Sequence, residues 1–193
     1  PNEIVDAIPF DQDTKHASYD RAYATRFWRI LLSAHRALTD FRSGFIGKVS
    51  PVHFFWGSFD LAVTRFSGRR APLHPGGVPN LPDTVVREAY SHEVSSAGFW
   101  PGGGGPMNEA AFYSYAYPAP DGFADAKVAA PGYFSKELGE FILPYEAART
   151  AADPDATLMA FLQSTYDAAA NLAKWDRAAL ECALGQIGKP RAV

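Results

Sequence analysis

The sequence has one cysteine, Cys182, among its 193 residues, so no internal disulfide can hold the fold together. Lys and Arg number 18 against 21 Asp and Glu, and this formal charge of -3 gives no overall positive field for nucleic acid or an anionic membrane. No apolar run approaches the roughly 18 to 20 residues that cross a bilayer. We therefore expect a protein of a reducing compartment such as the cytoplasm, with neither nucleic acid nor membrane as its partner.

The common catalytic motifs are also missing. The chain contains no G-x-S-x-G, no paired-cysteine metal motif and no G-x-G-x-x-G fingerprint. The run Gly102 to Gly105 lacks the Lys and Ser/Thr that follow in a P-loop, so it predicts a turn. No histidine spacing such as HExxH orders metal ligands. We predict no metal site, and the sequence names no cofactor.

A hydrophobic content of 47% is enough for one sizeable core. We expect a single α+β domain over residues 18–185, followed by a tail over 186–193. Residues 1–17 begin without methionine on an extended segment punctuated by prolines, which predicts a linker or strand that arrives from a preceding part of a longer protein.

The strongest local pattern predicts a long helix that starts near Ser18 or Asp20 and ends at Gly44 or Gly47. Apolar residues recur at intervals of three and four along it: Tyr23, Phe27, Ile30, Ala34, Leu38, Phe41 and Phe45. A second helix is predicted from Asp153-Pro154, a cap followed by proline in the first turn, to Trp175. A last short helix from Asp176 to Gly185 completes a C-terminal helical segment.

Between these helices the pattern predicts strands. Residues 52–56 and 60–66 form a hairpin at Gly57-Ser58, with positive φ at the glycine. Two more strands cover 91–100 and 110–118, and an edge strand covers 141–143. Residues 67–83 predict a long irregular loop, followed by a short helix capped by Asp83. We therefore expect an antiparallel sheet of hairpins with one face covered by the N-terminal helix and the C-terminal helical segment.

Two groups could supply acid–base chemistry. In a two-residue hairpin, Phe55 pairs with Asp60 and His53 lies opposite Ala62, which makes His53 and Asp60 diagonal neighbours on one face. An imidazole beside a carboxylate can act as a general base, although a satisfied polar pair is the more common arrangement. His92 and Glu93 are adjacent on a strand and therefore face opposite ways, so only one of them can enter the same cleft.

Arginines and aromatic residues suggest a ligand. Arg65, Arg69 and Arg70 form a local positive cluster that could clamp a carboxylate or phosphate, and a solvated hairpin end is the alternative. Among the many aromatic residues, those on the predicted sheet could line a flat organic ligand: Trp56, Trp100, Tyr113 and Tyr115.

Three stretches carry a resemblance: FIGKVSPVHFFWGSFDLAVTRFSGRRAP, REAYSHEVSSAGFWPG and FYSYAYP. They resemble a family of uncharacterised bacterial proteins known only as a domain of unknown function, over nearly the whole chain. The resemblance implies that members have an additional N-terminal part, so that this chain matches their C-terminal part. It implies no activity and no catalytic residue.

Two functions remain open. One is an enzyme or binding domain for a small molecule, with anionic ligands among the candidates, in a polar cleft built from His53, Asp60, Arg65, His92 and Glu93. The other is a structural or interaction domain that packs on a preceding N-terminal part or a partner subunit.

Overall fold

The computed structural model describes residues 8–79, 81–103, 107–183, 185, 188 and 189. Residues 1–7 of the predicted linker, part of the four-glycine run and most of the predicted tail lie outside the described residues. Within residues 8–20 the chain forms turns and no strand.

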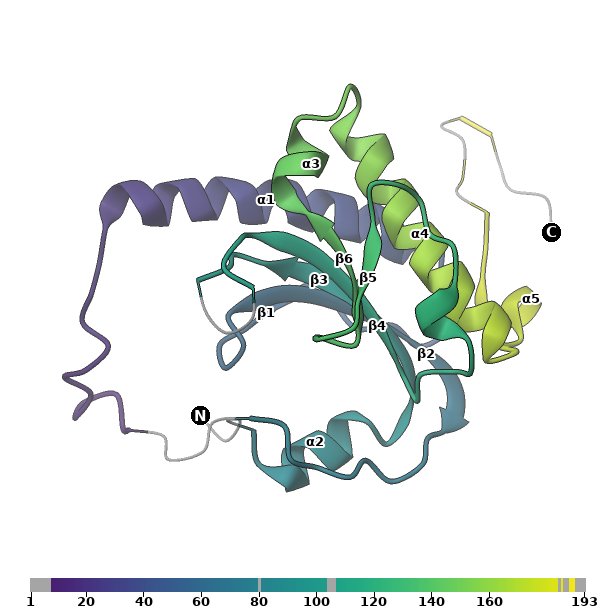
Figure 1. Ribbon diagram of the computed structural model, residues 1–193, viewed down its shortest axis with the longest axis horizontal. Helices are drawn as coiled ribbons and strands as arrows, with labels where there is room; N and C mark the ends of the chain where they lie inside the picture. The colour runs from purple at the N-terminus through teal and green to yellow at the C-terminus, as the bar shows by residue number, and fades with distance from the viewer. Residues whose placement is uncertain (1–7, 80, 104–106, 184, 186–187, 190–193) are drawn as a thin grey trace.

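A six-stranded antiparallel sheet forms the centre of the molecule (Figure 1). Its order is β1-β2-β3-β4-β6-β5. The strands are β1 (His53–Phe55), β2 (Asp60–Arg70), β3 (His92–Trp100), β4 (Ala111–Tyr117), β5 (Tyr133–Ser135) and β6 (Glu140–Pro144). This sheet, with helices packed on it, confirms the predicted α+β class.

Helix α1 (Arg21–Ser43) begins where the sequence predicts, because the side chain of Asp20 accepts a hydrogen bond from the backbone N–H of Tyr23. Its C-terminal half packs on the sheet through Ala34, Leu38 and Phe41. Its N-terminal half projects beyond the sheet (Figure 1), and Tyr23 of the predicted apolar stripe is exposed there.

Helix α4 (Pro154–Leu172) packs beside α1 on the same face of the sheet. The side chain of Asp153 caps its first turn, as predicted. Helix α3 (Tyr145–Arg149) follows β6 directly, a one-turn 3-10 helix spans Phe123–Asp125, and α5 (Arg177–Leu180) ends earlier than the predicted Gly185. These helices and the sheet enclose the apolar core.

Helix α2 (Asp83–Ala89) lies on the other side of the sheet (Figure 1). Its existence was predicted, but Asp83 does not cap it. The N-cap position is Pro82, and the Asp83 carboxylate instead accepts a hydrogen bond from the backbone N–H of Gly77, 2.9 Å away. Asp83 therefore ties the helix to the loop before it.

The β1–β2 hairpin has the predicted register and a different turn. Phe55 pairs with Asp60 and His53 with Ala62, which confirms the pairing. The turn spans four residues, Trp56 to Phe59, and Phe59 rather than Gly57 adopts the positive φ, of 59°. The ring of Phe59 stacks on Phe27 of α1 at 5.4 Å between centroids, so a tertiary contact accompanies this unusual backbone conformation.

Two other boundaries differ from prediction. Strand β2 continues to Arg70, into the predicted loop, because Arg70 still pairs with His92 after an irregularity in the ladder. Strand β6 is not an edge strand, since it lies between β4 and β5.

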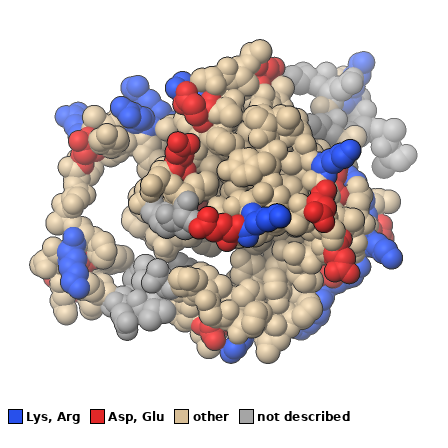
Figure 2. Space-filling model, in the orientation of Figure 1, with Lys and Arg blue, Asp and Glu red and all other residues tan. Residues whose placement is uncertain are grey.

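The surface carries charges of both signs. On the face drawn in Figure 2, Lys and Arg are interspersed with Asp and Glu, and most of these charges lie toward the rim. Among the described residues, no helix combines the length and apolar character needed to cross a membrane.

Candidate functional site

The two faces of the sheet have different surroundings. Side chains alternate along a strand, so Leu61 and Val63 of β2 point to the helical layer while Asp60 and Ala62 point the other way. The cross-strand register carries this division to the next strands, where Ser96 and Tyr113 share the face of Asp60. This second face is the one that α2 covers.

Aromatic contacts hold α2 and its preceding loop over the sheet. The hydroxyl of Tyr90, at the end of α2, donates a hydrogen bond of 2.9 Å to the hydroxyl of Tyr115 on β4. The hydroxyl of Tyr117 donates to the backbone carbonyl of Pro72 at 3.0 Å. The His74 ring packs against Tyr90 and Tyr117, with centroids 4.9 and 4.8 Å apart. These contacts fix the loop between β2 and α2 to strand β4.

A cavity of about 470 Å³ lies between α2 and the sheet. This volume falls in the range of small-molecule sites. Its apolar walls are formed by Phe55, Gly57, Ala62, Phe66, Leu81, Val85, Val86, Ala89 and Val94. Its polar lining consists of Ser50, His53, Ser58, Asp60, Thr64, Glu88, Tyr90, Ser96, Tyr113 and Tyr115.

Asp60 is the buried charged group of this cavity, with 6% of its surface exposed. One carboxylate oxygen accepts a hydrogen bond from the hydroxyl of Ser58 at 2.6 Å. The other accepts a hydrogen bond from the phenol of Tyr113, which reaches it from β4. Two hydroxyl groups therefore orient the carboxylate at the wall of the cavity.

Gly98 makes the contact between Tyr113 and Asp60 possible. It lies on β3 between Ala62 of β2 and Tyr113 of β4. A Cβ atom at Gly98 would lie 2.5 Å from the Tyr113 hydroxyl oxygen and 2.4 Å from the Leu61 carbonyl oxygen. The phenol can cross β3 only because this strand position has no side chain.

Burial also fixes protonation in the site. Burial, assisted by the negative charge of Asp60, raises the pKa of Tyr113 well above its ordinary value, so the phenol keeps its proton and remains a donor. Burial and the same carboxylate raise the pKa of Glu140 from 4.5 to about 7. Glu140 lies on the same face of the sheet, one residue beyond the β4–β6 pairing. A carboxyl with this pKa can take or release a proton near neutral pH.

His53 shares the sheet face of Asp60, as predicted, but no hydrogen bond joins the two in the described part of the chain. Its ring packs on Phe55 instead, with centroids 4.2 Å apart. His53 is exposed and lines the cavity from β1. The geometry therefore places it at the solvent side of the cavity.

Two residues of the predicted cleft, Arg65 and Glu93, lie on the other face of the sheet. Arg65 points to the helical layer, where its guanidinium donates to the carbonyl of Phe41 and stacks on that ring at 3.5 Å. Glu93 also points to that side and forms an ion pair of 2.7 Å with Arg69. Arg69 donates a further hydrogen bond to the carbonyl of Ala173 at the end of α4. The predicted cleft is therefore not assembled, because alternation divides its members between two faces.

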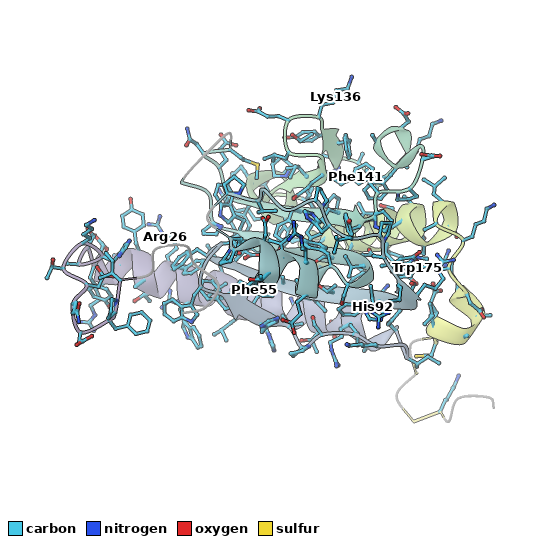
Figure 3. All side chains as sticks on the ribbon, turned by 90° about the horizontal axis from the view of Figure 1, so that it is seen from below. Arg26, Phe55, His92, Lys136, Phe141 and Trp175 are labelled. Atoms are coloured by element: carbon cyan, nitrogen blue, oxygen red, sulfur yellow. The ribbon has the colours of Figure 1, made fainter. Side chains whose placement is uncertain are left out.

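The remaining predicted residues are scattered. By alternation, His92 lies on the same sheet face as Asp60. It is nevertheless far from Asp60, because Asp60 lies level with Trp100 at the other end of β3, eight residues or roughly 26 Å away from His92. Figure 3 shows Phe55 and His92 toward opposite ends of the sheet. Trp56 is 71% exposed in the hairpin turn, and neither Trp56, Trp100 nor the exposed Arg70 lines the cavity. Of the predicted aromatic ligand residues, Tyr113 and Tyr115 do.

Sequence reasoning missed Gly98, Tyr90, Ser58 and Glu140. Gly98 had a usable signal, since an isolated glycine within a strand pattern marks a close approach of another group. Tyr90 was assigned only to the end of a short helix. Ser58 had a local signal, since it stands two residues before Asp60 in the same hairpin, whereas Glu140 had none, because its position depends on how β4 and β6 pair.

A second hollow in the part of the chain that the structure describes has a different lining. This larger hollow of about 940 Å³ between α1 and α3 is lined by the exposed arginines Arg21, Arg26, Arg29 and Arg149. Among the described residues, no three His, Cys, Asp or Glu side chains are grouped so as to hold a metal ion.

Comparison with known proteins gives a family and no function. A family model described as a family of unknown function, DUF5996, matches residues 1–182, so the chain belongs to that family. No curated protein and no solved structure matches it.

Proposed function

We propose that this member of the DUF5996 family binds a small organic molecule in the cavity between α2 and the second face of the sheet. One observation carries the proposal: the Asp60 carboxylate, oriented by Ser58 and Tyr113, lines a cavity whose surface is otherwise mostly apolar. Sites for small molecules combine apolar walls with a few placed polar groups in this way.

Energetics support the same proposal. Burying a carboxylate costs several kcal/mol unless hydrogen bonds compensate for its lost hydration. In a purely structural role, an apolar residue at position 60 would avoid this cost. The chain instead provides Asp60 with two hydroxyl donors from separate elements, and it leaves Gly98 bare so that one of them can reach.

The single cysteine supports our proposal that the domain works in a reducing compartment such as the cytoplasm. We leave the reaction open, because binding alone accounts for the geometry. The Glu140 carboxyl would be the first group to test for proton transfer in an enzymatic version of the site.

A thermal-shift screen of small organic molecules tests the proposal. A ligand at 100 times its Kd stabilises the folded state by about 2.7 kcal/mol, which for a chain of this size raises Tm by about 5 °C or more. Ala89→Trp, which fills the cavity from α2, should abolish the shift. Ala22→Trp, the same change on the exposed surface of α1, is the matched control and should retain it. A shift that survives in Ala89→Trp would contradict binding in this cavity.

A second candidate is packing against another protein or another part of the polypeptide. It is supported by the projecting half of α1, where Trp28 and Leu32, one helical turn apart, are 60% and 51% exposed. Large apolar groups gathered in this way are typical of interaction surfaces. Sedimentation of wild type and Trp28→Ser with Leu32→Ser over a range of concentrations would show whether this surface drives self-association.

A further inference from the structure

We propose that the ligand of the cavity is an organic cation, an amine or a quaternary ammonium group on an apolar body, held at Asp60. This inference rests on the proposed function of the cavity. It adds the chemical class of the ligand, which follows from the charge, the hydrogen bonding and the ring surfaces of the lining.

The first argument is the charge of the lining. It contains two carboxylates, Asp60 and Glu88, and no Lys or Arg. No ion pair of the described residues includes Asp60, although the chain has arginines available: Arg65 and Arg69 on β2 both point to the opposite face. Glu140 adds a third carboxyl close enough to Asp60 for the two to interact electrostatically. An anionic ligand would meet only repulsion from these groups.

The second argument is the unsatisfied capacity of the carboxylate. An ionised carboxylate has about four acceptor positions, and Asp60 receives one side-chain hydrogen bond on each oxygen. Both donors are neutral hydroxyl groups, so they orient the charge without neutralising it. An ammonium group provides up to three donors and the missing counter-charge.

The third argument is the aromatic surface near Asp60. Phe55 is directly opposite Asp60 in the β1–β2 ladder, and both line the cavity. The rings of Tyr113 and Tyr115 stack with their centroids 6.2 Å apart along β4 and also line it. Aromatic faces attract cations, and sites for ammonium ligands combine such faces with a carboxylate.

Matched triplets of small aromatic compounds test the inference. Phenethylamine, 2-phenylethanol and phenylacetate share one ring and differ in the charge of the terminal group, and larger amine, alcohol and carboxylate sets of the same design extend the size range. Isothermal titration at neutral pH should give the amine about a tenfold lower Kd than the alcohol, equal to about 1.4 kcal/mol. The carboxylate should bind more weakly than either.

Variants locate the charge that selects the amine. Asp60→Asn keeps an acceptor for Tyr113 and should bring the amine to the affinity of the alcohol, whereas Asp121→Asn, the same change on an exposed loop, should leave the tenfold preference intact. Should Asp60→Asn fail to fold, Glu88→Gln on the exposed side of the lining should lower the preference about twofold.

The outcomes separate this inference from the proposed function. One outcome is that alcohols or carboxylates bind the wild type at least as well as the amines and lose binding in Ala89→Trp. That result would refute the preference for a cation but would support the cavity as a binding site. An amine preference unchanged in both Asp60→Asn and Glu88→Gln would also overturn it. If no member of any triplet binds, both the cation and the proposed function fail.

Discussion

Changing Glu140 to Gln should alter the pH dependence of stability in a direction that the structure determines. Burial and the charge of Asp60 raise the pKa of Glu140 from 4.5 to about 7 in the folded protein. The folded state therefore holds this proton more tightly than the unfolded state does. The stability that this group contributes is fully present below about pH 4.5 and is lost as pH rises through about 7.

The size of the effect follows from the same two values. The difference between 4.5 and about 7 corresponds to between about 3 and 4 kcal/mol as an upper limit, since each pKa unit is worth about 1.4 kcal/mol. Urea denaturation followed by tryptophan fluorescence between pH 4.5 and 8.5 gives the unfolding free energies of wild type and variant. The variant should gain on wild type as pH rises, by a value approaching that limit.

A control separates the local environment of Glu140 from simple loss of charge. Glu137→Gln makes the same chemical change at an exposed position three residues earlier. If Glu140→Gln and Glu137→Gln show the same difference from wild type at every pH, the reasoning about a desolvated carboxyl that interacts electrostatically with Asp60 is refuted.

Two further substitutions test the packing on either face of the sheet. Gly98→Ala should lower the unfolding free energy, measured by chemical denaturation, by about 1–3 kcal/mol, because the new Cβ atom would clash with the Leu61 carbonyl and the Tyr113 phenol. An unchanged unfolding free energy would mean that the phenol does not cross β3. Arg65→Ala should lower the unfolding free energy by about 3 kcal/mol, because a buried charged hydrogen bond and ring stacking are both lost. Arg70→Ala, on the exposed strand end, is the control and should change it by no more than about 0.5 kcal/mol. Equal losses in the two variants would contradict the structural role of Arg65.

Local signals were enough for most of the elements. The apolar spacing from Tyr23 to Phe45 predicted α1, and Asp153-Pro154 predicted the start of α4, because both are short-range features of the sequence. The register of the first hairpin was predicted from a two-residue turn at Gly57-Ser58, and its pairing of Phe55 with Asp60 places His53 and Asp60 on one face. The turn itself could not be predicted, since Phe59 stacks on Phe27 from a helix more than thirty residues earlier.

The site was predicted only in part, and the errors have two physical causes: alternation along β2 already places Arg65, five residues from Asp60, on the other face, and the distances between strands were unknown. Asp60, Tyr113 and Tyr115 were singled out and do share the cavity, while Arg65 and Glu93 point to the helical layer. A sequence gives the alternation within each strand, but the distance between residues of different strands depends on sheet order and on where α2 lies. That placement is set by tertiary contacts, such as the hydrogen bond from Tyr90 to Tyr115.

The central claim is that the cavity between α2 and the sheet binds a small molecule. Chemical-shift mapping of the ¹⁵N-labelled protein, titrated with the tightest-binding amine of the matched triplets, tests it most directly. The account predicts that the largest changes fall on cavity positions of separate elements: Ala62, Val85, Ser96 and Tyr115. Changes confined to the projecting half of α1 around Trp28, with these four positions unmoved, would contradict it.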